Sequence, residues 1–214
     1  MQALARDSVA VDRLPPILVL KSTVDATVTT DAVVTRLLLG LPAGRNELLL
    51  FDINRNAAIK SKFLVDDPGP LTNRLMADPE LPFAVTFVTN EGPHSTRVVA
   101  RHKPPFTTET SRIEELDLAW PRGVASLSHV ALPFPPDDPI YGQQPPADDE
   151  QVFLGDLAIK GERGLLKIPG EWLLRLRYNP FYDYMQTRVL QWLDATDSSS
   201  VSEGISKFSI SSQQ

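Results

Sequence analysis

The chain has 214 residues, of which 42% are hydrophobic and 22% are charged, and its formal net charge is −6. This composition is typical of a globular protein with one large domain or two small ones, and the negative charge argues against nucleic acid as a partner because phosphates would be repelled. The chain has no cysteine, which excludes disulfides, cysteine-ligated zinc and a thiol nucleophile.

The first half of the chain alternates strand and helix patterns. The run "PPILVLKS", Pro15–Ser22, predicts a strand buried on both faces, and "DAVVTRLLLGLP" after it predicts a helix capped by Thr29 or Thr30. Further along, the pattern predicts a strand at Asn46–Asn54, a short helix at Gly69–Ala77 and a strand at Pro82–Asn90. Strand, helix and strand in this order are typical of a right-handed βαβ unit, so the predicted fold class is α/β with a mostly parallel sheet and flanking helices.

The second half of the chain is less regular. Ser95–His102 predicts a strand that pairs as a hairpin with the one before it, and the capping-box spacing of Ser111 and Glu114 predicts a short helix. Gly123–Leu132 predicts a strand that runs into a long proline-rich loop. Phe181–Leu193 predicts a terminal helix. Residues 1–195 therefore form the folded part, and the serine-rich residues 196–214 are predicted to be a disordered tail.

Asp25 is the first candidate catalytic residue. It lies a few residues beyond the first predicted strand, and the carboxyl edge of an open parallel sheet is where active sites lie. A carboxylate there can accept a hydrogen bond from an imidazole N–H and so orient the ring. The alternative is that Asp25 only stabilises its own turn, as aspartate often does.

His129 is the second candidate. Four prolines between residues 133 and 139 stiffen the loop behind it, and a catalytic imidazole must be held at one angle. The alternative is a structural histidine packed beside its apolar neighbours. His94 and His102 compete for the same role, but neither follows a predicted buried strand and precedes a stiff loop.

Two stretches, "PPILVLKSTVDATV" and "SLSHVALPFPPDDPIYG", resemble the acid-bearing and histidine-bearing segments of α/β-hydrolase serine hydrolases. "ELLLFDINR" and "RYNPFYDYMQTRVLQWL" fit the same bacterial esterase or lysophospholipase-like group, so the resemblance covers residues 14–193. It implies the C-terminal part of an α/β-hydrolase fold, with Asp25 as the triad acid and His129 as the general base. The implied substrate is a small-molecule or lipid-like carboxylic ester, and neither a metal nor an organic cofactor is implied.

The nucleophile is where the chain departs from this family. The motif Gly-x-Ser-x-Gly is missing, since the one pair of glycines at that spacing is Gly40 and Gly44, with Pro42 between them. The triad order in this fold is serine, acid, histidine, so the serine and the oxyanion hole are expected upstream of Asp25, in an N-terminal half outside these residues. We therefore expect the chain alone to be inactive. The alternative is a non-catalytic, truncated or degenerate hydrolase half that acts as a binding or assembly module.

The long stretch of sequence between Asp25 and His129 leaves open a second candidate for the triad acid. Either residues 82–102 form an inserted hairpin that extends the sheet, or the acid sits one strand earlier than usual. In the second case Asp52, after the second predicted strand, is the rival acid.

The expected partners follow from the missing half. Its absence would leave a long apolar strand edge, so we expect this chain to bind that half or to self-associate through the edge. Adjacent carboxylates in the loops are expected to be solvated rather than metal-bound. The sequence shows no signal-peptide pattern and no membrane-spanning run, which favours a cytoplasmic or membrane-peripheral location.

Overall fold

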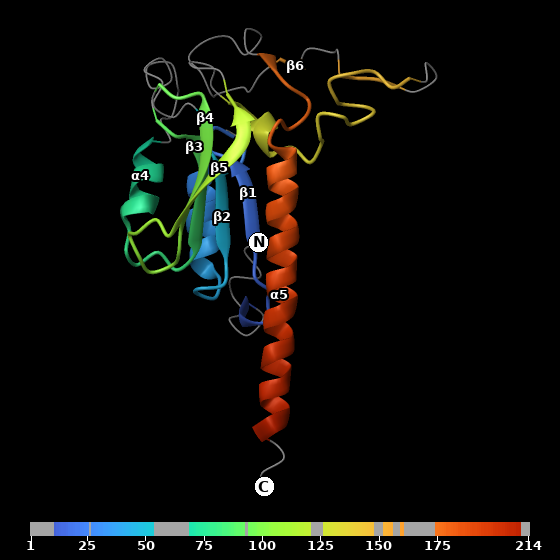
Figure 1. Cartoon of the computed structure of the whole chain (residues 1–214). Coiled ribbons are helices and arrows are strands. Elements are labelled where there is room, and N and C mark those ends of the chain that lie inside the picture. The colour runs from blue at the N-terminus through green and yellow to red at the C-terminus, as the bar shows by residue number, and fades with distance from the viewer. Residues whose placement is uncertain are drawn as a thin grey trace.

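The computed structural model describes residues 11–25, 27–53, 69–92, 94–120, 126–147, 152–155, 159–160 and 174–210, with side chains left undescribed at 159–160, 174–175 and 197–210. Its centre is a five-stranded sheet in the order β1-β2-β3-β4-β5 (Figure 1). The strands are β1 (Leu18–Ser22), β2 (Glu47–Phe51), β3 (Ala84–Asn90), β4 (Arg97–Lys103) and β5 (Arg112–Ala119). The strands β1, β2 and β3 are parallel, whereas β4 and β5 run antiparallel to their neighbours. The fold is therefore of the α/β class, with a mixed sheet whose first part is parallel.

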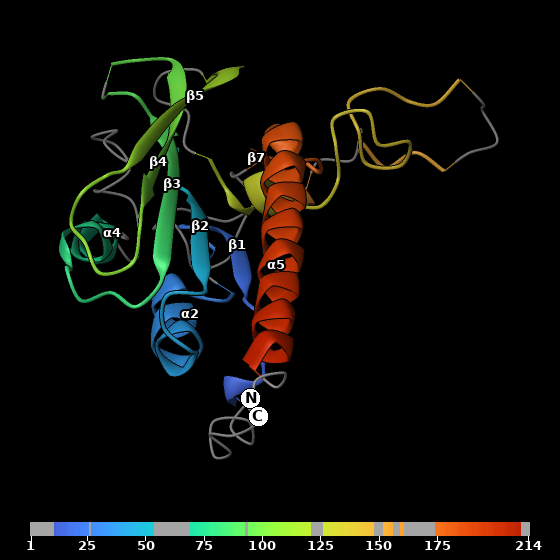
Figure 2. The same ribbon diagram turned by 60° about the horizontal axis from the view of Figure 1, so that its bottom comes forward.

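Helices cover both faces of this sheet. The helices α2 (Thr30–Arg36) and α4 (Gly69–Ala77) lie on one face, and α5 (Tyr182–Ile210) lies across the other (Figure 2). A short 3-10 helix, η2 (Leu38–Gly40), continues α2. A separate two-stranded antiparallel pair joins β6 (Ile159–Lys160) to β7 (Leu174–Arg175).

The start of α2 confirms the predicted cap. The Oγ1 atom of Thr29 accepts a hydrogen bond from the backbone N–H of Ala32 at 3.3 Å, and Asp31 lies in the first turn, where it complements the positive end of the helix. Thr30, the other candidate, is the first residue of the helix and is buried.

Strand β2 explains why its sequence is a continuous apolar run. Leu48 and Leu50 pack in the core beneath α2 and α4, whereas Leu49 and Phe51 belong to the core beneath α5. All five residues of β2 are buried, because the strand has a neighbour on each side and a helical layer on each face.

Two predicted elements of the second half are wrong. The capping-box spacing of Ser111 and Glu114 predicts a helix, but the structure has strand β5 there, because its backbone hydrogen-bonds to β4. A strand was predicted at Gly123–Leu132. Among the described residues of that stretch, Ser128–Ala131 form a 3-10 helix, η3, which packs against β1 and has no strand neighbour to pair with.

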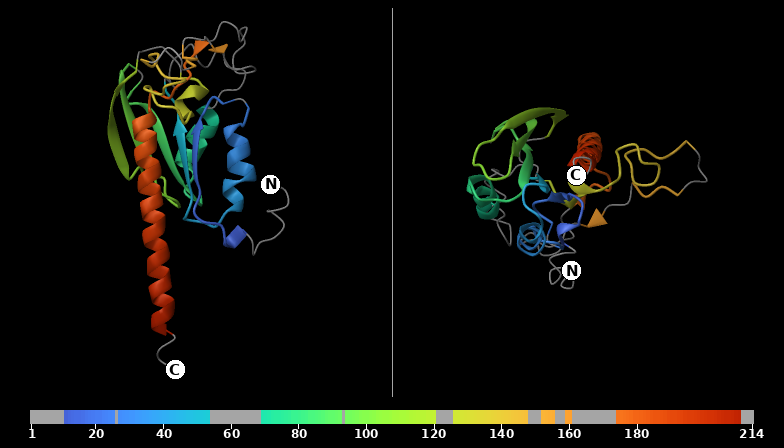
Figure 3. Two further views of the ribbon diagram at one scale, coloured as in Figure 1. Left: turned by 90° about the vertical axis from the view of Figure 1, so that its right-hand side faces the viewer. Right: turned by 90° about the horizontal axis from the view of Figure 1, so that it is seen from below.

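Helix α5 is longer than the sequence predicts. Its backbone continues to Ile210, through residues expected to belong to a disordered tail. At about 1.5 Å per residue, the end of the helix projects well beyond the sheet (Figures 1 and 3). Helices elongate more easily than they nucleate, so the packed first turns around Phe181 and Met185 favour the continuation.

Candidate functional site

The structure brings the two sequence-predicted site residues to one end of the sheet. Asp25 follows the carboxyl end of β1, and His129 lies in η3, which packs against the same strand. Figure 3 shows η3 beside the arrowheads of the parallel strands. Asp25 and His129 are distant in the sequence, and the chain crosses four other strands before it returns from β5 to β1.

The carboxylate of Asp25 organises its own turn. Its Oδ1 accepts hydrogen bonds from the backbone N–H groups of Thr27 and Val28 at 2.9 and 3.3 Å, and its Oδ2 lies 3.2 Å from Nζ of Lys21. Among the described residues, none of these bonds reaches His129. The predicted hydrogen bond between Asp25 and His129 therefore stays a prediction, and Oδ2 retains the lone-pair capacity to accept it.

Asp52, the rival acid, also lies at the carboxyl edge of the sheet. It follows β2 directly, is fully buried, and its Oδ1 accepts a hydrogen bond from the hydroxyl of Thr23 at 2.8 Å. The backbone carbonyl of Asp52 accepts a further bond from Thr89 at 3.0 Å. Asp52 thus joins the ends of three neighbouring strands.

His129 is held by aromatic rings. Only 4% of the residue is exposed, and its imidazole stacks on the indole of Trp120 with ring centroids 6.3 Å apart. Trp120 stacks in turn on Phe181 at the start of α5, 5.4 Å away. The ring plane of His129 is therefore set by packing from β5 and α5, which suits either a catalytic or a structural histidine.

The loop behind His129 is ordered by its own contacts. Phe134 and Tyr141 pack with ring centroids 4.5 Å apart, and the backbone carbonyl of Phe134 accepts a bond from the N–H of Asn179 at 2.7 Å. Asp138 closes the next turn by accepting from the N–H groups of Ile140 and Tyr141. The sequence prediction of a stiff loop is consistent with these bonds.

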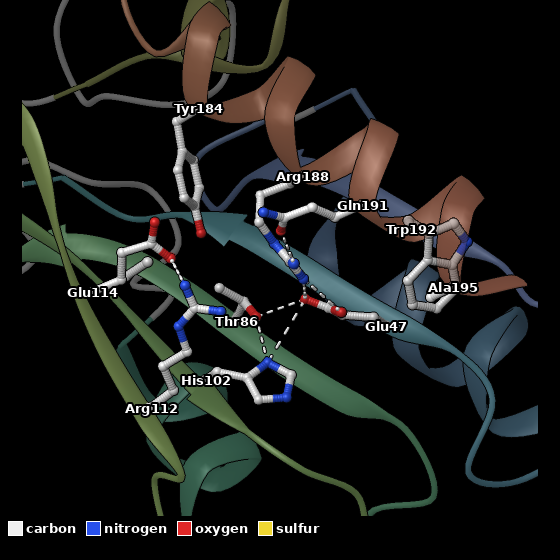
Figure 4. A pocket seen from close by; sticks show the side chains of 11 residues that line it. Glu47, Thr86, His102, Arg112, Glu114, Tyr184, Arg188, Gln191, Trp192 and Ala195 are labelled. Carbon is white, nitrogen blue, oxygen red and sulfur yellow. Dashed lines mark hydrogen bonds and ion pairs between the residues drawn. The ribbon is translucent and has the colours of Figure 1, made fainter. Parts of the chain in front are cut away.

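A second polar cluster lies at the opposite end of the sheet, and the sequence did not point to it. Three of its members form a row across the face that α5 covers: Thr86 on β3 is directly opposite His102 on β4, which is opposite Arg112 on β5. Glu47, the first residue of β2, extends the row, and Arg188 reaches it from α5. Figure 4 shows these side chains converging from four strands and the helix.

Glu47 is the centre of this cluster. Its side chain is only 5% exposed, and it accepts hydrogen bonds from Arg188 at 2.9 and 3.0 Å and from the Thr86 hydroxyl at 2.6 Å. The Thr86 oxygen also lies 2.8 Å from Nδ1 of His102. Because the one hydroxyl proton of Thr86 points to Glu47, Nδ1 of His102 must carry a proton and donate it to Thr86.

The environment of His102 keeps its imidazole neutral. Burial is the largest cause and lowers the pKa of His102. The carboxylate of Glu47 acts in the opposite direction, and the charges of Arg188 and Arg112 lower the pKa further. The neutral ring therefore has Nδ1 as a donor and Nε2 as an acceptor.

A hollow of about 280 Å³ opens beside this cluster, between α5 and the sheet. On the helix side it is lined by Tyr184, Gln191 and Trp192 (Figure 4). Burial raises the pKa of Tyr184 to about 12, so its hydroxyl stays protonated even in moderately alkaline solution. No sequence motif could reveal this hollow, because its walls come from segments on both sides of the long loop region.

The described residues contain no group of three or more histidine, aspartate or glutamate side chains placed to hold a metal ion. Within the same part of the chain, no helix is both long and apolar enough to cross a lipid bilayer. Comparison with protein-family models, with curated proteins and with solved structures finds no match to this chain.

Proposed function

We propose that this chain supplies the acid and the base of a serine hydrolase site that acts on carboxylic esters, and that the serine comes from a segment outside these 214 residues. The observation that carries the proposal is the return of the chain to β1: His129 packs at the end of the strand that leads to Asp25. Parallel strands with helices on both faces bind ligands at this edge. The resemblance of both segments to α/β-hydrolases supports the same assignment.

The proposed chemistry needs two proton transfers by His129. The imidazole takes the proton of the serine hydroxyl as its oxygen attacks the ester carbonyl, and then gives that proton to the departing alcohol. Water repeats the sequence on the acyl-enzyme and releases the acid. Asp25 accepts the hydrogen bond of the second imidazole nitrogen and stabilises the imidazolium, while Trp120 keeps the ring plane constant.

The test is reconstitution of activity. The chain alone should neither hydrolyse p-nitrophenyl esters above the level of a His129→Ala variant nor react with a fluorophosphonate probe. Co-expression with the gene segment encoded upstream, if it bears a Gly-x-Ser-x-Gly motif, should produce serine labelling and turnover that both His129→Ala and Asp25→Asn reduce. Active complexes whose turnover is unaffected by His129→Ala would contradict the proposal.

One observation favours the second candidate, a non-catalytic assembly module. Strand β1 lies at the end of the strand order, and among the described residues its outer edge has no strand partner. Leu18, Val19 and Leu20 on this edge are partly exposed. An unpaired edge of this kind is a template for strand addition by another chain.

Size-exclusion chromatography with light scattering tests this candidate. Self-association that Val19→Lys abolishes would support it, and a monodisperse monomer of 23.7 kDa would contradict it. The control is Ile113→Lys on β5, at the other edge of the sheet, which should leave the association unchanged. Because Val19 packs partly against the core whereas Ile113 is exposed, circular dichroism must first show that both variants fold.

A further inference from the structure

The hollow beside α5 presents hydrogen-bond donors that the protein does not use. Among the described residues, the hydroxyl of Tyr184 has no hydrogen-bond partner. The amide oxygen of Gln191 accepts a bond from Arg188 at 2.9 Å, which leaves the amide N–H₂ group as the free end of that side chain. Arg112 donates to Glu114 through one terminal nitrogen, so its other guanidinium N–H groups are available.

The two carboxylates of the same hollow are already engaged. Glu47 accepts hydrogen bonds from Arg188 and Thr86, and more than nine-tenths of its side chain is buried. Glu114 accepts a hydrogen bond from Arg112, but this pair is exposed: 61% of the Arg112 side chain and 38% of the Glu114 side chain are accessible. Surface ion pairs of this kind contribute little to stability, so another carboxylate can replace Glu114 at Arg112. A molecule that enters the hollow therefore meets several unused donors, and the acceptors left to it are Nε2 of His102 and the second oxygen of Glu114.

The balanced charges of the hollow argue against a strongly anionic occupant. Arg112 and Arg188 are balanced by Glu114 and Glu47, and His102 is neutral, so the lining carries no large positive charge that would favour a phosphate or a dianion. A single carboxylate can be held by one guanidinium group and one further donor. The guanidinium group binds it through two parallel hydrogen bonds. The remaining walls, Ala100 and the indole of Trp192, are apolar.

We propose that this hollow binds a small organic monocarboxylate with a compact apolar body. The carboxylate lies between the guanidinium of Arg112 and the hydroxyl of Tyr184, which approach each other from the sheet and from the helix in Figure 4. The apolar body packs against Trp192. The site is at the amino end of β2, whereas Asp25 and His129 lie at the carboxyl edge, so the proposal is independent of the proposed hydrolase reaction.

Benzoate is the probe that tests this proposal, with benzyl alcohol as the uncharged analogue of the same size. Each is titrated into the full chain while the indole N–H signal of Trp192 is followed by NMR and assigned with a Trp192→Phe variant. Benzoate should shift the signal in a saturable way. Benzyl alcohol should bind at least about tenfold more weakly, because it lacks the charged acceptor, and tenfold corresponds to about 1.4 kcal/mol.

Three variants locate the carboxylate. Arg112→Gln and Tyr184→Phe should each weaken benzoate binding by about tenfold or more. Arg97→Gln is the matched control, because it removes a similarly exposed arginine from the neighbouring strand, where Arg97 pairs with Glu115 outside the hollow. The proposal is overturned if benzoate causes no saturable shift, if benzyl alcohol binds as tightly, or if Arg112→Gln binds benzoate like Arg97→Gln.

Discussion

One guanidinium nitrogen of Arg188 donates to both carboxylate oxygens of Glu47, at 2.9 and 3.0 Å, although the two residues are 141 positions apart in the chain. Glu47 is the first residue of β2, and Arg188 lies in the second turn of α5. The side chains are 5% and 17% exposed. This pair therefore attaches the long terminal helix to the sheet at a site from which water is largely excluded.

Arg188→Leu should destabilise the protein by about 3 kcal/mol, because it leaves the buried carboxylate of Glu47 without its counter-charge. Urea unfolding followed by circular dichroism measures the loss. Arg97→Leu, which removes an exposed arginine paired with Glu115, should cause a much smaller loss. The double variant Arg188→Leu, Glu47→Leu should recover part of the stability, since neither charge is then left alone. Equal losses in Arg188→Leu and Arg97→Leu would contradict the role of the pair.

The stability of the protein should fall on acidification through the titration of His102. The pKa of His102 in the fold is below its ordinary value of 6.5, mainly because of burial. The unfolded chain therefore binds more protons in the interval between the two pKa values, and the free energy of unfolding decreases as the pH falls below about 6.5 towards the folded-state pKa.

Urea unfolding at closely spaced pH values, for the unmodified chain and for His102→Gln, isolates this contribution from that of other groups. The difference in stability between the two proteins should shift in favour of His102→Gln as the pH falls. A difference that is constant from neutral to mildly acidic pH would contradict the burial of this imidazole.

Tyr184 should ionise later than an ordinary tyrosine. Burial is the largest cause that raises its pKa to about 12, so its phenolate should form only in strongly alkaline solution. When phenolate absorbance is followed during an alkaline titration, the transition at the highest pH should be missing in Tyr184→Phe and present in Tyr178→Phe. Loss of a lower-pH component in Tyr184→Phe would show that the ring is not enclosed between α5 and the sheet.

The parallel part of the fold could be predicted because each element carries a strong local signal. The apolar runs at β1 and β2 have no polar face, since these parallel strands are covered by helices on both sides. The start of α2 has a capping threonine, Thr29, whose side chain accepts the bond that the pattern predicts. The range of α4, Gly69–Ala77, coincides with its prediction.

The edge strand β5 could not be predicted in the same way. It is mostly exposed and strongly polar, so its sequence lacks an apolar pattern, and only pairing with β4 makes it a strand. The capping-box spacing of Ser111 and Glu114 is a local signal that this tertiary pairing overrides.

The sequence named two residues of the candidate site, and their pairing stays a prediction. Motifs pointed to Asp25 and His129, and the structure places both near the carboxyl end of β1. The contact between Glu47 and Arg188 has no sequence signal, because it depends on how α5 lies across the sheet. His102 stands in a polar stretch of β4, and its neighbours in space come from β2, β3 and α5.

Gly142 is required by the proline-rich loop behind His129. A Cβ atom at this position would meet the backbone of Asp138 and would lie 2.6 Å from the carbonyl oxygen of Pro136. Gly142→Ala should therefore destabilise the loop by about 1–3 kcal/mol and make it more susceptible to limited proteolysis. Gly92→Ala is the control, because no atom lies within 4 Å of its added Cβ. Equal cleavage of the two variants would contradict the close packing of the loop.

The hydrogen-bonded state of the His129 imidazole tests the central claim most directly. Nitrogen–proton correlation spectra of the full chain, with the ring assigned by His129→Gln, report which ring nitrogen carries the proton and whether it is hydrogen-bonded. If Asp25 is the acid partner, Asp25→Asn should shift the His129 ring signals strongly and Asp52→Asn should leave them nearly unchanged. A strong shift in Asp52→Asn alone, or no shift in either variant, would contradict the pairing of Asp25 with His129.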